Sequence, residues 1–245
     1  MFTKLANIFK PSSSSQNTIH TTDLHSHLIP GIDDGVKDFD ESIEIIRELQ
    51  ELGFKKIITT PHIMHHRFPN TQEKILEVYS QLQYELKRKN IQMKVDVAAE
   101  YYYDEYFVAL IDKRELMTFG DNHILFELSY TLKPFMMEQT VVKLLAAGYR
   151  PILAHPERYT YYKTLQDYER VKDMGLLFQI NAISLDGFYG KNVKKSAELL
   201  VEAGLVDFIG SDIHSMKYLD AFAKVLQSKL YKKCFEQNII QNSSL

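Results

Sequence analysis

The chain has 245 residues, of which 45% are hydrophobic and 25% are charged, values that are typical of a globular protein with a packed core. Its 29 basic and 32 acidic residues nearly balance, which argues against nucleic acid or an anionic membrane surface as a partner. A single cysteine, Cys234, excludes an internal disulfide, and no apolar run approaches the ~20 residues that span a membrane. We therefore expect a cytoplasmic protein without a transmembrane segment.

The two ends of the chain differ from its middle. Residues 1–20 contain a polar run at positions 11–17 that cannot bury enough surface to offset the entropic cost of ordering, so they predict a flexible N-terminal arm. Residues 21–240 predict a single domain, and the last residues, 241–245, are expected to fray.

Between these ends, short apolar runs alternate with helical patterns. The expected strands are residues 22–27, 56–60, 93–100, 123–128, 151–155, 176–181 and 206–211. The expected helices are residues 38–52, 71–90, 106–114, 134–147, 165–174, 192–203 and 218–238. The strands are almost continuously apolar, as in a parallel sheet that is covered on both faces. Seven β–α units without an internal repeat predict an α/β fold, in the form of a closed or distorted barrel.

Residues that commonly bind metals cluster at the carboxyl ends of these strands. The first strand ends in His25-Ser-His27, and the last is followed by Asp212-Ile-His214. His62, Glu100, Glu127 and His155 occupy equivalent positions at four of the strands between them. In a parallel barrel all these side chains face one mouth, which is where the active sites of such barrels lie.

Each of these residues alone also has a structural interpretation. In an extended segment, residues two apart point the same way, so His25 and His27 would repel one another if both were charged. A shared cation removes that cost, whereas the alternative is one core histidine beside an exposed one. Glu100 and Glu127 end apolar strands and must be paired with a cation, either a metal or a basic side chain.

The ligand set is a mixture of nitrogen and oxygen donors without thiolate, which suits Mn²⁺, Fe or Zn²⁺. Several carboxylates favour Mn²⁺ among these three. With three or four protein ligands per ion, the residues provide for two to three divalent metals.

Seven segments resemble, in chain order, the bacterial PHP-type (polymerase and histidinol phosphatase) protein-tyrosine phosphatases of the CpsB/YwqE kind. They are residues 23–35, 59–62, 98–103, 125–128, 154–159, 181–187 and 210–214. The His-x-His motif marks only the wider group of PHP and amidohydrolase-like proteins. The extension Pro-Gly-Ile-Asp-Asp-Gly at 30–35 and the block His-Pro-Glu-Arg-Tyr at 155–159 are more specific to these phosphatases.

The resemblance implies a distorted seven-stranded, TIM-like PHP barrel with a metal centre that usually contains manganese. It implies the metal ligands His25, His27, Asp34, His62, Glu100, Glu127, His155, Asp212 and His214. Arg158 matches the phosphate-contacting arginine of the family, and Asp34 is implied only by the resemblance, since Asp33-Asp34-Gly35 is otherwise typical of a turn. His65 is a further candidate for assisting the leaving group.

The function that follows is hydrolysis of phosphotyrosine by water that the metals activate, without a phosphocysteine intermediate. The resemblance implies that the substrate is the C-terminal tail of a membrane tyrosine autokinase that controls capsular or exopolysaccharide synthesis, so that the protein would lie at the membrane periphery through its partner. Two alternatives remain: a small-molecule PHP phosphatase of the histidinol-phosphate type, and a non-catalytic scaffold that binds a kinase.

Overall fold

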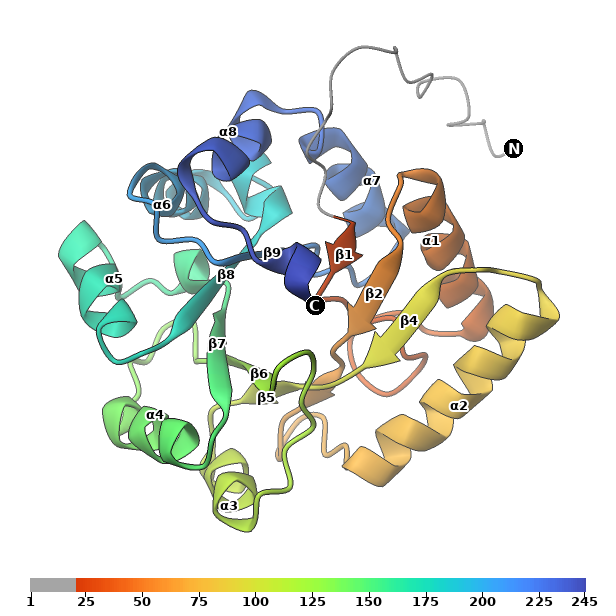
Figure 1. The fold of residues 1–245 in the computed structure, drawn as a ribbon, viewed down its shortest axis with the longest axis horizontal. Coiled ribbons are helices and arrows are strands. Elements are labelled where there is room, and N and C mark those ends of the chain that lie inside the picture. The colour runs from red at the N-terminus through yellow and green to blue at the C-terminus, as the bar shows by residue number, and fades with distance from the viewer. Residues whose placement is uncertain (1–20) are drawn as a thin grey trace.

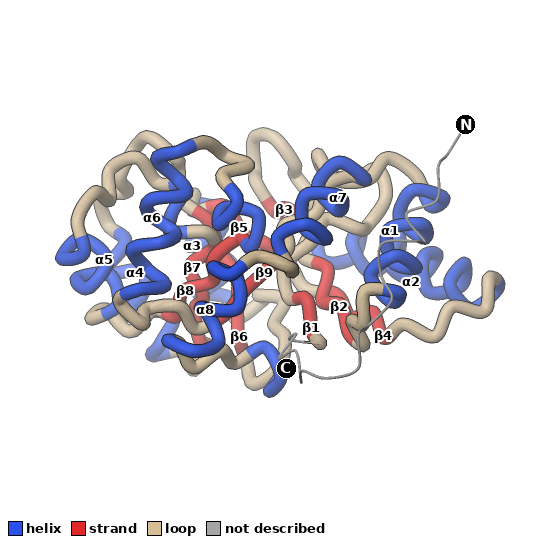
Figure 2. The backbone as a smooth tube through the Cα atoms, turned by 90° about the horizontal axis from the view of Figure 1, so that it is seen from above, coloured by secondary structure: helices blue, strands red, loops and turns tan. Residues whose placement is uncertain are grey.

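The structure, a computed structural model, describes residues 21–245, so the predicted arm at residues 1–20 lies outside the described residues. Parallel strands occupy the centre of the molecule and helices surround them (Figure 1), and the view from above shows the same strands between the helices (Figure 2). The strands are β1 (Thr22–Asp23), β2 (Lys56–Thr59), β3 (His62–Ile63), β4 (Lys94–Val97), β5 (Glu100–Tyr102), β6 (His123–Glu127), β7 (Arg150–Ala154), β8 (Leu177–Asn181) and β9 (Phe208–Gly210). The helices are α1 (Phe39–Glu51), α2 (Gln72–Arg88), α3 (Glu105–Lys113), α4 (Met137–Ala146), α5 (Leu165–Lys172), α6 (Lys191–Glu202), α7 (Met216–Val225) and α8 (Lys229–Gln237).

The strands form two parallel sheets, in the orders β1-β2-β4 and β3-β5-β6-β7-β8-β9. A parallel bridge between Ser26 and Ile213 joins the segment after β1 to the segment after β9. Two further backbone hydrogen bonds run beside it, from His27 N to Ile213 O at 2.9 Å and from Asp212 N to His25 O at 2.8 Å. The α/β, TIM-like arrangement is therefore confirmed, with the beginning and the end of the strand series hydrogen-bonded to each other.

Two of the expected strands are interrupted. The strand expected at 56–60 continues after Pro61 as β3, and the strand expected at 93–100 becomes β4 and β5. Pro61 has no N–H group to donate, so the ladder cannot continue through it. Hydrogen bonds from Ala98 N to Thr59 O and from Glu100 N to Pro61 O connect the break between β4 and β5 to the break between β2 and β3. The distortion therefore lies next to two of the predicted ligands, His62 and Glu100.

The helices agree with the sequence pattern except at two boundaries. Asp38 caps α1 by accepting a hydrogen bond from Glu41 N at 2.9 Å, as its position predicted. The helix expected at 134–147 begins only at Met137, and the helix expected at 218–238 is divided into α7 and α8. Ser228 lies between these two helices and caps α8. No helix in the described part of the chain combines the length and the apolar character that crossing a membrane requires.

The C-terminal tail is ordered, so the expected fraying of residues 241–245 was wrong. The Asn242 side chain is fully buried; it donates to Thr22 O and Ile209 O at 2.9 and 2.8 Å and accepts from Ile209 N at 3.0 Å. Polar composition predicted exposure, but these hydrogen bonds satisfy the amide inside the protein. The tail thereby connects β1 to β9, and these two strands lie beside one another in Figure 1.

Candidate metal centre

All nine residues that the sequence proposed as metal ligands lie together at the carboxyl ends of the strands. Four overlapping groups of donor atoms, each with its members within 4.8 Å of one another, contain the complete set. The groups are His27, Asp34, His62 and His214; His25, His27 and Glu100; His25, His155 and Asp212; and His62, Glu100 and Glu127. The parallel topology predicted this convergence of residues that are up to 189 positions apart (His25 to His214).

The innermost donors belong to His25, His27, Glu100 and Asp212. His25 Nε2 lies 3.2 Å from Glu100 Oε2 and 3.3 Å from Asp212 Oδ1, and His27 Nε2 lies 3.3 and 3.4 Å from the same two oxygens. The two Nε2 atoms are 3.4 Å apart. Two atoms bonded to one ion at ~2.1 Å in tetrahedral arrangement are separated by about 3.4 Å. The inner donors therefore have a spacing that suits a shared divalent ion.

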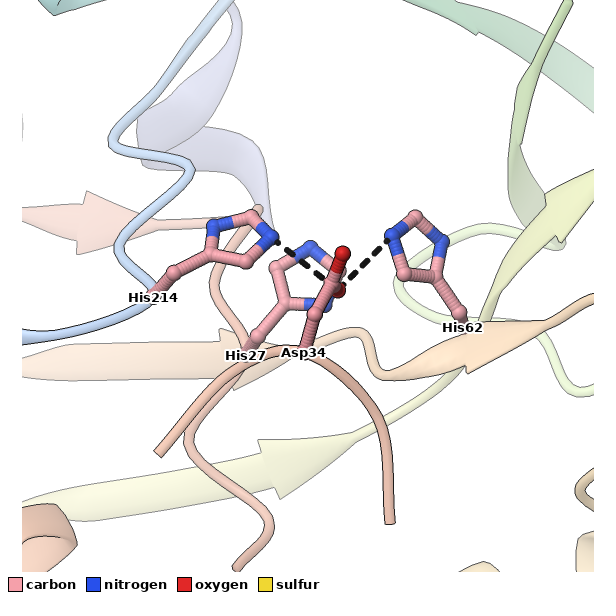
Figure 3. Close-up of side chains that lie close together, drawn as sticks. All are labelled: His27, Asp34, His62 and His214. Atoms are coloured by element: carbon pink, nitrogen blue, oxygen red, sulfur yellow. Dashed lines mark ion pairs between the residues drawn. The ribbon is translucent and has the colours of Figure 1, made fainter. Parts of the chain in front are cut away.

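A second group lies nearer the opening of the site, where Asp34 reaches between two imidazoles (Figure 3). Asp34 Oδ1 is 3.5 Å from His62 Nε2 and 3.5 Å from His214 Nε2. The ring of His214 stacks on that of His27 with 4.0 Å between centroids. Because Asp34 is more exposed than the inner carboxylates, this part of the centre faces solvent.

His62 shows that these contacts resemble metal ligation more than hydrogen bonding. Its buried Nδ1 lies 3.2 Å from Glu100 Oε2 and 3.5 Å from Glu127 Oε1, yet it has no hydrogen-bond partner. A buried polar atom without a partner costs roughly 1–3 kcal/mol. A cation between the nitrogen and the oxygens would remove that cost, so the residues present fit a divalent metal.

The electrostatics of the carboxylates support the same conclusion. Burial, together with the adjacent Glu100 carboxylate, raises the pKa of Glu127 well above its ordinary value. Burial disfavours the charged form of His25, but the Glu100 and Asp212 carboxylates outweigh it and raise the His25 pKa to about 9. Both shifts are upward, as expected where several carboxylates converge, and bound cations would relieve the repulsion between the two glutamates.

Backbone conformation directs two of these side chains into the site. His155 and Asp212 follow β7 and β9 with φ of 34° and 53°, a left-handed conformation that non-glycine residues rarely adopt. It costs on the order of 1–3 kcal/mol per residue and is concentrated at functional sites. Gly210 precedes this turn, and a Cβ atom there would lie 2.7 Å from His25 Cβ. Only glycine therefore allows β9 to approach His25 so closely.

Two residues that are not predicted ligands fix the orientation of the paired histidines. Asp33 Oδ2 accepts from His27 Nδ1 at 2.8 Å and from His62 N at 2.9 Å, and Asp33 Oδ1 accepts from Gly35 N at 2.9 Å. Gln179 Oε1 accepts from His25 Nδ1 at 2.8 Å. In both histidines Nδ1 thereby donates a hydrogen bond away from the centre, and Nε2 is the nitrogen that faces it and would bind a metal.

Asp212 is oriented through one of its two oxygens. Its Oδ2 accepts from Asn181 Nδ2 at 2.6 Å, from Arg158 Nη1 at 3.1 Å and from the Tyr189 hydroxyl at 3.2 Å. Three donors saturate this oxygen, so only Oδ1, which faces His25 and His27, is available to a metal. Asn181 and Gln179 are themselves hydrogen-bonded at 2.9 Å. They are two apart on the buried strand β8, a pattern of buried amides that is visible in the sequence.

Arg158 lies between two aromatic rings at the wall of the site. Its guanidinium carbon is 4.5 Å from the centroid of Tyr130 and 4.2 Å from that of Tyr189. Both tyrosines, Arg158 and seven of the predicted ligands line one cavity of about 880 Å³. The two rings restrict the guanidinium, whose N–H groups are of the kind that binds phosphate bidentately.

Two other candidates lie away from this cavity. His65 is exposed, stacks on Tyr106 with 5.4 Å between ring centroids, and does not line the cavity. The structure therefore gives no geometric support to a role for His65 in leaving-group protonation. Cys234 is fully buried in α8, and burial raises its thiol pKa to about 12. A nucleophilic cysteine is excluded on both counts.

The matches to known proteins agree with this geometry. The model of the family "Capsular polysaccharide synthesis, CpsB/CapC" matches residues 21–244. The chain belongs to this family. It is 33% identical over 198 residues to the tyrosine-protein phosphatase YwqE of Bacillus subtilis, covering 80% of this chain and 78% of the relative. It is 30% identical over 234 residues to the tyrosine-protein phosphatase CpsB of Streptococcus pneumoniae, covering 88% and 95%.

Solved structures extend the comparison to the fold. One from a study of YwqE and CpsB, described there as unique metal-dependent tyrosine phosphatases, superposes with a TM-score of 0.74 at 31% identity and covers 85% of this chain and 89% of that one. The phosphotriesterase homology protein of Escherichia coli gives a TM-score of 0.51 at 14% identity, covering 89% and 91%, which shows a shared fold alone. The fold of this chain is thus found outside the CpsB/CapC family as well.

Proposed function

We propose that this protein is a metal-dependent protein-tyrosine phosphatase of capsular or exopolysaccharide synthesis. The observation that carries the proposal is the convergence of nine residues with nitrogen or oxygen donors, seven of which line one cavity together with Arg158. The sequence relatives and the related solved structure are named as phosphatases of this specificity. The autokinase tail as substrate follows from the resemblance and stays a prediction.

The nine donors would hold two to three divalent ions, with Mn²⁺ as the first candidate and Fe or Zn²⁺ as alternatives. When bound, these ions would supply Lewis acidity toward the phosphate and lower the pKa of a water molecule. The protein residues supply the rest. Asp33 and Gln179 hold the imidazole protons on Nδ1, and Asp212 offers a single oxygen.

Arg158 would bind the non-bridging oxygens of the phosphate through the exposed edge of its guanidinium. Tyr130 and Tyr189 would hold the guanidinium in place, because their rings contact it and their hydroxyl groups donate to Glu127 and Asp212. Because the guanidinium of Arg158 is already held in position, little reorganisation is needed when charge develops on the phosphate. The aromatic residues that line the same cavity would receive the phenyl ring of the substrate.

The deciding experiment measures metal content and activity on the same preparation. We expect bound divalent metal, hydrolysis of phosphotyrosine peptides, loss of hydrolysis after chelation, and recovery when Mn²⁺ is restored. Histidinol phosphate should be a poorer substrate than a phosphotyrosine peptide. Undiminished turnover after complete removal of metal would refute the proposal, and a preference for histidinol phosphate would favour the small-molecule alternative.

A further inference from the structure

The loop between β6 and α4 exposes large apolar side chains beside the cavity. Nine large hydrophobic residues are exposed in the described part of the chain, and six of them fall between Tyr130 and Leu145. Within the loop, Leu132 is 74% exposed, Phe135 100% and Met136 50%. We call these three residues the apolar loop surface. Exposed apolar residues grouped in this way commonly mark an interaction site.

The loop that carries this surface is continuous with the wall of the catalytic cavity. Its first residues, Ser129, Tyr130 and Thr131, line the cavity directly after the strand that ends in Glu127. Phe135 is five positions after Tyr130, which corresponds to at most about 18 Å of extended chain. A polypeptide whose phosphotyrosine occupies the cavity can therefore place its neighbouring residues on this surface.

The base of the loop is fixed, so the outward position of the apolar side chains is not the result of a loose backbone. The Thr160 backbone N–H and hydroxyl donate to Tyr130 O at 2.9 and 3.0 Å, and the Tyr161 hydroxyl donates to Ser129 O at 3.0 Å. Leu132 N donates to Ser129 Oγ at 3.2 Å. A preorganised surface loses little conformational entropy when a partner binds.

The rest of the cavity rim is different in character. Lys37, Glu41 and Arg67 line the side contributed by the segments after β1 and β3, and they are polar and charged. Residues 128–136, the loop that contains the apolar loop surface, include one cation, Lys133, and so lack the basic cluster that draws a protein to an anionic membrane. Its three side chains expose on the order of 400 Å², which is below the ~800 Å² per partner of a standard protein dimer.

Resting on the proposed phosphatase function, we infer that the apolar loop surface binds the substrate polypeptide next to its phosphotyrosine. The chemistry that it fits is an extended segment with leucine, phenylalanine or another apolar side chain within a few residues of the phosphorylated tyrosine. The cavity binds the phosphotyrosine itself, and the apolar loop surface distinguishes one phosphotyrosine site from another by its neighbouring side chains. Hydrogen bonds to the peptide main chain are therefore not needed. The surface thereby makes the enzyme selective for proteins over small aryl phosphates.

The test compares a small and a large substrate in the same variants. The substrate is a peptide in which leucines flank the phosphotyrosine. Both Phe135→Ser and the double variant Phe135→Ser with Leu132→Ser should raise the KM for this peptide by about tenfold, which is the effect of removing one apolar side chain from contact. The KM and kcat for p-nitrophenyl phosphate should stay unchanged, since neither residue lines the cavity. Ile239→Ser removes an equally exposed apolar side chain (87%) elsewhere and is the matched control.

A companion peptide with serines in place of leucines should bind the wild-type protein as weakly as the leucine peptide binds the double variant. If both variants process the leucine peptide as the wild type does, the inference is overturned. It is likewise overturned if the variants change only self-association in sedimentation, or only binding to anionic vesicles. Failure of the wild type to hydrolyse any phosphotyrosine substrate would instead refute the proposed function, so the two failures are distinguishable.

Discussion

The variant Asp33→Asn should bind metal more weakly than the wild type while it remains folded. Asp33 is buried and presents two carboxylate oxygens to three donors, which are His27 Nδ1, His62 N and Gly35 N. An asparagine has one acceptor oxygen, so its NH₂ group must face either Gly35 N or the pair of donors on His27 and His62. If it faces His27, the imidazole proton must move to Nε2, the nitrogen that points at Glu100 and Asp212.

The size of the effect follows from this change of tautomer. Removal of a carboxylate that orients a ligating histidine typically weakens metal binding by about 10–100-fold, or roughly 1.4–2.7 kcal/mol. The loss of a charged acceptor for the two backbone N–H groups adds on the order of 1–3 kcal/mol to the cost in folding stability. We therefore expect Asp33→Asn to remain folded and to lose metal at lower chelator concentrations than the wild type.

Metal content after dialysis against a series of chelator concentrations measures this affinity directly, and circular dichroism shows whether the variant is folded. Asp40→Asn is the control, because the Asp40 carboxylate is exposed on α1 and pairs only with Lys89. If the Asp33→Asn protein is folded and binds metal as tightly as the wild type, the orientation of His27 by Asp33 does not contribute to metal affinity.

Four further outcomes are expected. Arg158→Ala and His155→Ala should each abolish phosphotyrosine hydrolysis with the fold retained, and full activity in either variant would remove that residue from the mechanism. Tyr189→Leu should weaken inhibition by inorganic phosphate by about tenfold, while Tyr189→Phe, which keeps the ring on Arg158, should change it less; equal effects would show that stacking is unimportant. Cys234 should resist iodoacetamide in the native protein because burial holds its thiol protonated, which mass spectrometry can check. Asn242→Ala should lower the free energy of unfolding by about 3 kcal/mol in urea titrations, and the exposed Ser243→Ala should leave it unchanged.

The sequence predicted the parts of this molecule that depend on periodicity and on chain direction. Strand-like apolar runs gave the parallel α/β architecture, and chain direction then placed His25, His62, His155 and Asp212 at one end of it. The resemblance contributed Asp34, which local pattern alone indicates only as a turn residue. Interruption of two strands beside Pro61 was not predicted, since apolar runs do not reveal where a strand changes its partner.

The sequence was less informative about contacts that depend on side-chain packing. The polar tail around Asn242 was expected to fray, because composition cannot show that a buried amide finds three partners. The stacking of Tyr130 and Tyr189 on Arg158 was equally hidden, since the three residues come from separate loops. His65 was selected for its chemistry alone, and its ring lies against Tyr106 instead.

Strand β8 shows why the number of ligands underestimates how much of the fold the centre requires. It contributes none of the nine predicted ligands, yet Gln179 holds the proton of His25 on Nδ1 and Asn181 occupies Oδ2 of Asp212. Because the two amides are themselves hydrogen-bonded, rotation of either one disturbs ligands that arrive from β1 and from β9. The Gln-x-Asn pair therefore couples His25, which follows β1, to Asp212, which follows β9, and polar residues two apart on a buried strand are a sequence signal for such a site.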